Sequence, residues 1–553
     1  MNKFLSRFLF IFKPTYTKLV WLYLFSVGYY SYLLIYSSYQ DSLILRPDFE
    51  ESNNQIQQRV YNETNNESSC VLPKLNPWDP TIRKQMKEPK SRIKKCSPAY
   101  EPLTSLKNGR LRVNCHHAIN DYETKIDAWK RLDTKEGNVP GCDIIEIGCW
   151  RFWFIRVYWF VHTQIVETQT LKNNSNQPDF YWIVVDTVSM SMLQRALPKT
   201  IKVLEEKYQA VNINSRTNAY GMFFGEVYDY NKDPWCDIPL DDKNFIGFDF
   251  KQSGYVTHSS EDWVLGVTNW AQCIGFKHKQ FDHYVRPFWQ RLGTGFFPTD
   301  KDRLEKSYPN LLVQFQMLLR QCKQTHNYVF EHLMQFASSY KQQPKFSIVW
   351  PVLLTHNDDT QLFYEDDYFA DYFEKLHEKA KNAFYFLSRR PRRSFWERFP
   401  FTMCRNVFET SSSLMRQLKQ NSQQLVSHFD LHASAFQIAK FSHTWNETTD
   451  FNQPMSPVNN RTFIGSSIFH QMTQPRICEN MGIPSHYCIC LQETQQLNDK
   501  QLELQAAQTL IDFINYKLKI SEYNELCQSH KISTTYPIQL EELKQKELKH
   551  SNA

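Results

Sequence analysis

Three polar residues stand directly after apolar segments and are the first candidates for chemistry. Asp186, His356 and Arg389 each follow a run that is typical of a buried strand. The carboxyl ends of parallel strands meet at one edge of a sheet, where α/β proteins place their ligand sites. A carboxylate and an imidazole are ligands for a divalent metal ion, whereas an arginine favours an anion.

The segments around these residues predict the fold. The apolar runs that read as strands cover residues 180–185, 345–355 and 382–388. Amphipathic segments that read as helices cover residues 198–210, 366–381, 430–441 and 497–520. Strands that alternate with helices predict an α/β fold with a mostly parallel sheet flanked by helices.

The composition excludes several classes of protein. Of the 553 residues, 41% are hydrophobic and 15% aromatic, which is too many for a long disordered chain. The net charge of +6 is small for this length, so no nucleic-acid partner is expected. The mean hydropathy of −0.55 also excludes a multi-span transporter.

The N-terminal segment predicts a membrane anchor. Residues 19–40 contain no charge and are long enough to span a bilayer, and basic residues precede them. By the positive-inside rule, residues 1–18 form a cytosolic tail and the rest lies in the secretory lumen or outside the cell. The prediction is a single-pass type II membrane protein with a signal anchor. A cleaved signal peptide and a buried core helix are the alternatives.

Cysteines and glycosylation sequons agree with a lumenal location. All 13 cysteines follow the apolar segment, which favours disulfides over the zinc site that Cys488-x-Cys490 could also indicate. Five N-x-S/T sequons predict a glycoprotein, at Asn62, Asn66, Asn173, Asn446 and Asn460.

Changes in composition along the chain predict its domains. Residues 41–69 are polar and read as a stalk. Residues 70–175 read as a small cysteine-containing module, residues 176–490 as the α/β domain, and residues 491–553 as a helical tail.

Many short motifs resemble those of an animal family of single-span proteins. They include CVLPKLNPWDP (70–80), VVDTVSMSMLQRALPKT (184–200), SGYVTHSSED (253–262), HFDLHA (428–433) and RICENMGIPSHYCIC (476–490). This family carries a sulfatase-like domain of the alkaline phosphatase superfamily. The resemblance implies a metal-dependent phosphoester or sulfoester hydrolase, in which a metal ion activates a nucleophilic hydroxyl.

Two positions of the family site keep suitable residues. Asp186 matches the family's first metal ligand at a strand end, although a lone Asp there could equally cap the next helix. Counting back from Gly225 in NINSRTNAYGMFFG places Ser215 at the nucleophile position and Asn218 at a later family Asn. The residues around Ser215 depart from the family pattern, so a plain loop serine is the alternative.

The third family element is lost. The family carries Ser-Asp-His-Gly after a strand, and this chain reads Ser388, Arg389, Arg390, Pro391. Two metal ligands are thus replaced by permanent cations. A divalent ion at 4 Å from one such charge is repelled by about 2 kcal/mol even in bulk water. No cofactor is therefore expected; an active enzyme would need zinc, manganese or calcium.

Other acids and histidines could still bind an ion. Residues 356–359 and 365–367 could hold a second ion, or could belong to a solvated loop and a helix start. His428 or His432 could supply the late His that the superfamily often uses.

The prediction is a pseudoenzyme: a type II membrane glycoprotein with an eroded sulfatase-like site that acts by binding. The expected partners are the membrane, through residues 19–40, and an anionic glycan or a protein. The run 389–393 also reads as a solvated loop or a protease cleavage site, and an inexact gene model could have shortened it. The alternative function is an active hydrolase that uses Ser215.

Overall fold

The computed structural model describes most of the chain after residue 70. The described residues are 70–72, 76–80, 82, 102–114, 118–122, 129–131, 140–151, 155–168, 177–186, 188–208, 211–212, 219–227, 238–263, 266, 274–292, 323–356, 359–390, 401–405, 412–446, 448–456, 458, 461–483, 488, 490, 494–520, 527–533, 538 and 540–543. Among them, no helix has the length and apolar character needed to cross a membrane. The predicted tail, anchor and stalk lie outside the described residues and stay predictions.

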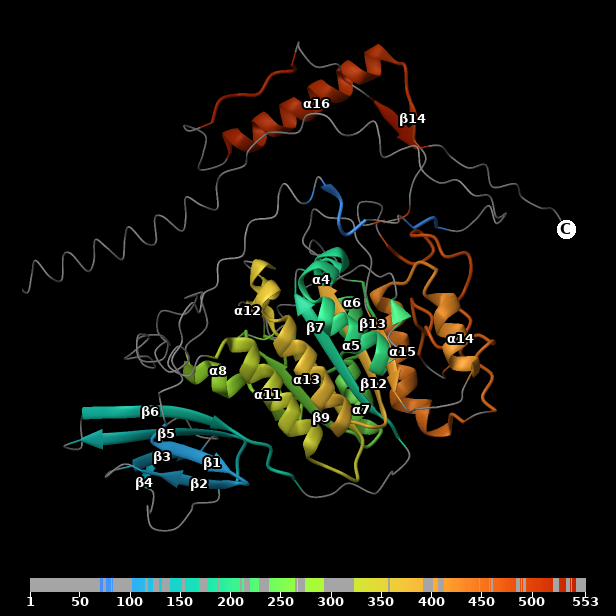
Figure 1. The fold of residues 1–553 in the computed structure, drawn as a ribbon. Coiled ribbons are helices and arrows are strands. Elements are labelled where there is room, and N and C mark those ends of the chain that lie inside the picture. Colours follow the sequence, from blue (N-terminus) through green and yellow to red (C-terminus); the bar gives the residue numbers. More distant parts are fainter. Residues whose placement is uncertain are drawn as a thin grey trace, which may run out of the picture. The chain divides into compact units, whose positions relative to one another are not determined.

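A seven-stranded sheet forms the centre of the fold (Figure 1). In spatial order its strands are β10 (His283–Tyr284), β9 (Val256–Glu261), β11 (Lys345–Trp350), β7 (Asp179–Asp186), β12 (Ala383–Arg390), β13 (Phe401–Arg405) and β8 (Val211–Asn212). The five strands from β10 to β12 pair in parallel, and β13 pairs antiparallel with both neighbours. The predicted mostly parallel sheet is confirmed.

The predicted strands are present, with different ends. Every residue of β7 is buried, as its continuous apolar run predicts. The expectation that one strand covers 345–355 is wrong, because β11 ends at Trp350 and Val352–Thr355 form the short helix α12. Pro351 has no N–H to donate to a neighbouring strand, which stops the strand there. β12 instead runs past its predicted end at 388 to Arg390.

Helices cover both faces of the sheet, as the alternating pattern predicts. One face packs on α4 (Met190–Ala196), α5 (Pro198–Tyr208), α11 (Thr325–Ser338) and α13 (Asp366–Lys379). The other face packs on α6 (Ala219–Phe224), α7 (Ile246–Gln252), α14 (Ser412–Asn421) and α15 (His428–Phe441). Alternate residues of β7 enter the two cores, with Ile183 in the first and Trp182 in the second.

Residues 104–163 form two antiparallel sheets before the central one. The first pairs β1 (Thr104–Lys107) with β2 (Arg110–Val113). The second has the order β4 (Trp129–Arg131), β3 (Ala118–Tyr122), β5 (Ile144–Arg151) and β6 (Ile155–Thr163). Asp143, just before β5, lies 2.6 Å from Nδ1 of His283 in β10, which joins these strands to the central sheet.

The remaining elements are short, apart from one helix. They are α8 (Arg286–Leu292), η1 (Asp359–Tyr364), η2 (Ser442–Thr444), β14 (Thr494–Gln496), α16 (Lys500–Lys519) and β15 (Glu541–Leu543). The disulfide Cys70–Cys490 ties the first described residues to the C-terminal part of the chain, and Cys478–Cys488 closes a short loop within that part. The predicted use of cysteines for disulfides is confirmed at these positions.

Candidate functional site

The carboxyl ends of β7 and β12 lie side by side. In the register of these parallel strands, Arg390 is the partner of Asp186 and Arg389 is the partner of Val185. Asp186 is fully buried, and the Thr355 hydroxyl donates to its backbone carbonyl. The strand end that the sequence predicts as a metal-ligand position is therefore next to the two arginine positions.

Asp186 does not cap the helix that follows it. Oγ of Ser189 accepts a hydrogen bond of 3.0 Å from the N–H of Met192 and caps α4. Ser189 is therefore the N-cap residue of α4.

The predicted nucleophile lies outside the described residues. The described chain ends with β8 at Asn212 and resumes with α6 at Ala219, so Ser215 and Asn218 fall between them. Gly225, from which Ser215 was counted, is described and has a positive φ of 68°. A Cβ atom there would lie 2.5 Å from the ring of His432, so only glycine fits.

His432 is engaged in a buried polar cluster. Its Nδ1 lies 3.2 Å from the Met222 carbonyl oxygen, and its Nε2 lies 3.1 Å from Nη2 of Arg461. Since Arg461 can only donate, Nε2 accepts and the proton is on Nδ1. Burial, and secondarily the charge of Arg461, lower the pKa of His432 to about 3. Both ring nitrogens are therefore occupied, which leaves none for a metal ion.

A buried ion pair completes this cluster. Nη1 of Arg461 donates to both carboxylate oxygens of Asp249 at 2.8 Å, and its guanidinium lies 4.4 Å from the ring centre of Phe436. Burial raises the pKa of Asp249, and Arg461 opposes that shift. The sequence analysis missed this pair, because Asp249 and Arg461 are 212 positions apart and no local motif joins them.

The acids at 365–367 are bound within the fold. Asp366 accepts hydrogen bonds from the N–H groups of Lys199 (3.0 Å) and Thr200 (2.8 Å) and so caps α5. Glu365 lies 3.0 Å from Nε2 of His326. Asp367 forms an exposed ion pair with Lys199 at 2.5 Å. The helix-start alternative for these acids fits the contacts better than a second ion site.

The other predicted ligands are placed only in part. His356 is exposed at the end of α12, and residues 357–358 lie outside the described part. His428 is fully buried at the first position of α15.

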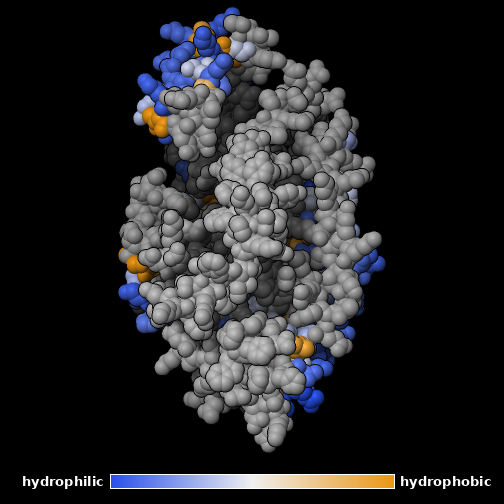
Figure 2. Space-filling view, turned by 90° about the vertical axis from the view of Figure 1, so that its left-hand side faces the viewer, coloured by the Kyte–Doolittle hydropathy of each residue, from blue (hydrophilic) through white to orange (hydrophobic). Residues whose placement is uncertain are grey.

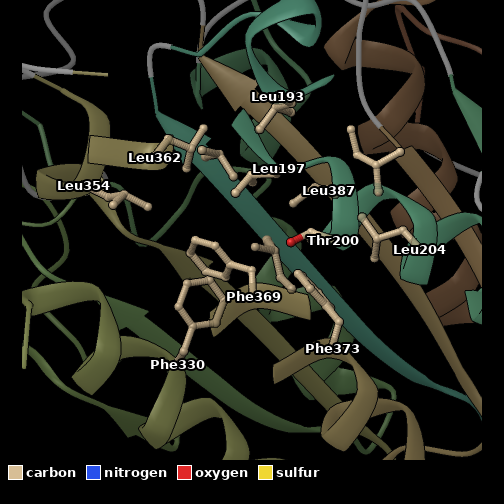
Figure 3. A pocket seen from close by; sticks show the side chains of 13 residues that line it. Leu193, Leu197, Thr200, Leu204, Phe330, Leu354, Leu362, Phe369, Phe373 and Leu387 are labelled. Carbon is tan, nitrogen blue, oxygen red and sulfur yellow. The ribbon is translucent and has the colours of Figure 1, made fainter. Parts of the chain in front are cut away.

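A cavity lined by residues of β7 and β12 is apolar (Figure 3). Val185 and Leu387 line it from the sheet, and the side chains of α4, α5, α11 and α13 close it. Its volume of about 20 Å³ has room for about one water molecule. Thr200 brings a hydroxyl to it, which is bonded to Asp366 at 2.9 Å. A phosphate or sulfate group would find neither the space nor the donors here.

Three side chains with suitable ligand atoms come together at one place in the described part of the chain, namely at Cys478, Cys488 and Cys490. Those sulfurs belong to the two disulfides. At the end of β7, the register partners of Val185 and Asp186 are arginines, a residue type that supplies no ligand atom to a cation.

The sequence matches one known protein family over most of its length. A family described as "Protein of unknown function (DUF229)" matches residues 63–387 and 395–535. The chain belongs to the DUF229 family. In this DUF229 chain the match is interrupted over residues 388–394, which include Arg389 and Arg390.

Other comparisons add little. No curated protein matches the chain. Among solved structures, the crystal structure of the PsFucS1 sulfatase from Pseudoalteromonas sp. is 9% identical. That match covers 58% of this chain and 74% of the sulfatase chain, with a TM-score of 0.30.

Proposed function

We propose that this DUF229 protein is a non-catalytic member of the alkaline phosphatase superfamily with a sulfatase-like domain, and that it acts by binding. The mostly parallel sheet, with an aspartate at the end of its central strand β7, supports the superfamily. The sequence motifs that resemble the family's motifs support it independently.

One observation carries the proposed loss of catalysis: the register that pairs Asp186 with Arg390 and Val185 with Arg389. Adjacent strands are about 4.8 Å apart, so the arginine positions lie within a few ångströms of the ligand position. A fixed positive charge held about 4 Å from a divalent cation would disfavour it by several kcal/mol at a partly buried site. The same charges favour an anion.

We further propose a type II membrane glycoprotein in the secretory lumen or outside the cell. The uncharged segment 19–40 supports the anchor. The disulfides Cys70–Cys490 and Cys478–Cys488 fit an oxidising compartment. The Asn446 sequon is exposed, and Oδ1 of Asn446 accepts a bond of 2.7 Å from the Thr448 hydroxyl.

The proposed ligand is a sulfated glycan or another anionic group on a partner, held by the arginines of residues 389–393. Guanidinium groups match the oxygens of sulfate and phosphate with paired hydrogen bonds. Binding of the purified full chain to immobilised heparin tests this directly. Replacement of Arg389 and Arg390 by Gln should lower the salt concentration needed for elution, whereas Lys500→Gln and Lys519→Gln on α16 remove the same charge elsewhere and serve as the control.

An active hydrolase that uses Ser215 is the second candidate, and the burial of Asp186 at the expected strand end favours it. Hydrolysis of nitrophenyl phosphate and nitrophenyl sulfate distinguishes the two candidates. Turnover that is lost in Ser215→Ala would establish the hydrolase and exclude the pseudoenzyme. Rates equal to that of Ser215→Ala would exclude the hydrolase.

A further inference from the structure

Helix α16 has an unusual exposed face. None of its 20 residues is buried, yet large apolar side chains such as Phe513 (56% exposed) project from it. Figure 1 places α16 at the top of the view, and the described residues at the top of Figure 2 show hydrophobic residues among hydrophilic ones. One exposed stripe has the alternating three- and four-residue spacing of a coiled-coil seam. This seam consists of Leu502, Ala506, Thr509, Phe513, Tyr516 and Ile520.

The opposite side of α16 is covered by the protein's own chain. Asn515 exchanges two hydrogen bonds with the backbone of His530, of 2.9 and 2.7 Å. The half-buried residues of the helix gather on this side, namely Ala507, Ile511, Ile514, Asn515 and Leu518, and half-buried Glu503 lies at its edge towards the seam. The exposed seam is thus a separate face that the described chain does not cover.

We propose that the seam pairs with the seam of a second copy of this chain, with the two helices antiparallel. An antiparallel arrangement centred on residue 511 places Ala506 opposite Tyr516 of the second copy. It likewise places Thr509 opposite Phe513 and Leu502 opposite Ile520. Each small residue then faces a large one, which is how packed layers fill space. Under this two-fold symmetry, the same face of each copy forms the interface.

The charges beside the seam fit this arrangement. In an antiparallel pair, Glu503 flanks Lys517 of the second copy, and the symmetry produces this attraction twice. Leu510 meets its own copy near the centre and extends the apolar contact. Asp512 also approaches Asp512 of the second copy. This single repulsion is set against the two Glu503–Lys517 attractions. A parallel pair would instead stack Phe513 on Phe513 and Ala506 on Ala506, with bulky and empty layers in alternation.

The polar member of the seam is prepared for burial. The Thr509 hydroxyl donates to the Gln505 carbonyl of its own helix at 2.8 Å, so it needs no partner from the second copy. Lys517 lies 5.5 Å from the ring centre of Phe513, beside the seam rather than within it. The seam is about 30 Å long and spans fewer than three heptads, so the dimer should be concentration-dependent.

Co-capture of two differently tagged full-length chains from detergent extracts tests the dimer. Phe513→Glu should reduce co-capture by about tenfold or more, because it places two carboxylates in the closed seam. Leu504→Glu is the matched control, since Leu504 is 55% exposed on the same helix but outside the seam. Absence of wild-type co-capture, or an equal effect of both variants, would overturn the proposal. Equal thermal unfolding midpoints should verify that both variants fold.

Disulfide trapping tests the orientation. In a Cys527→Ala background, one tagged chain carries Thr509→Cys and the other carries Phe513→Cys. The antiparallel layer predicts a disulfide between the two different chains. A disulfide between two Phe513→Cys chains, or no disulfide at all, would overturn the antiparallel pairing.

Discussion

Asp186 and Arg390 are register partners at the ends of two adjacent parallel strands. The pairing joins a fully buried carboxylate position to a position that always carries positive charge. In the family that the sequence resembles, a metal ligand stands at the second position. On the proposed function, the two strands keep one ligand position of the family's metal site and replace its neighbour by a positive charge.

The first prediction concerns coupling between these two positions. Asp186→Asn and Arg390→Gln should each lower the free energy of unfolding, and the double variant should lose less than the sum. We expect a coupling energy of about 1–3 kcal/mol, because neighbouring opposite charges stabilise each other where water is scarce. Denaturant unfolding of all four proteins measures it. The exposed pair Lys199–Asp367 is the control and should show little coupling in the same experiment. Strictly additive effects of the Asp186 and Arg390 substitutions would contradict the prediction.

The second prediction separates backbone strain from a clash at Gly225. Gly225→Ala should destabilise the protein by about 2 kcal/mol or more. The alanine must adopt a left-handed backbone conformation, and its Cβ would clash with the His432 ring. Gly266→Ala is the control, because Gly266 has the same φ of 68° but its Cβ would lie 3.7 Å from Glu261. Thermal unfolding should show a clearly larger loss for Gly225→Ala. Equal losses would mean that the ring adjusts without cost.

The third prediction is a loss of stability in acid. His432 has a folded pKa of about 3, and His162 and His332 of about 4, each lowered by burial from 6.5. At a pH between the folded and unfolded pKa values, these histidines are neutral in the folded protein and protonated in the unfolded chain. Unfolding therefore takes up protons, and the free energy of unfolding falls as the pH decreases from 6.5. Asp262, whose pKa burial raises to about 6, opposes this in part, because it gains its proton earlier in the folded state.

His432→Gln isolates one of these contributions. The variant should flatten the decrease by about 1.4 kcal/mol per pH unit between pH 6 and pH 4. Urea unfolding across this range measures the slope, with His443→Gln, at an exposed histidine, as the control. A slope that matches the wild type in both variants would argue against a neutral His432 in the folded protein.

The fourth prediction tests the proposed lumenal location. Asn446 and Thr448 are both exposed, so an oligosaccharyltransferase can reach this sequon. In animal cells, Asn446→Gln should remove one glycan and shift the band on a gel, and glycosidase treatment should remove the difference. Asn452→Gln, at a nearby asparagine outside any sequon, should leave the band unchanged. An unglycosylated Asn446 in the wild-type chain would count against the proposed topology.

The sequence predicts well which apolar segments form core strands, but it predicts poorly the residues at which these strands end. β7 and β12 are continuous apolar runs, so their burial can be seen directly. β9 was missed because its polar residues are buried, and polarity conceals a core strand. His258 in β9 lies 2.6 Å from the Ser347 hydroxyl and 2.8 Å from His332, so the groups satisfy one another within the core. Such pairings depend on residues far apart in the chain.

In the candidate site, too, some residues could be identified from the sequence and others could not. Asp186 and the arginines could be found because they directly follow recognisable strands. The cluster of Asp249, Arg461 and His432 could not, since packing of α7 and α15 and a distant loop creates it. In the sequence, a partly buried arginine such as Arg461 looks like an ordinary surface residue until its aspartate partner is known.

Metal content of the purified full-length protein tests the central claim most directly. After equilibration with zinc, manganese and calcium and then exhaustive dialysis, elemental mass spectrometry should find far less than one ion per chain. Asp186→Asn should have the same content as the wild type. A stoichiometric ion that is lost in Asp186→Asn would contradict the account and would make the active hydrolase the better description of this protein.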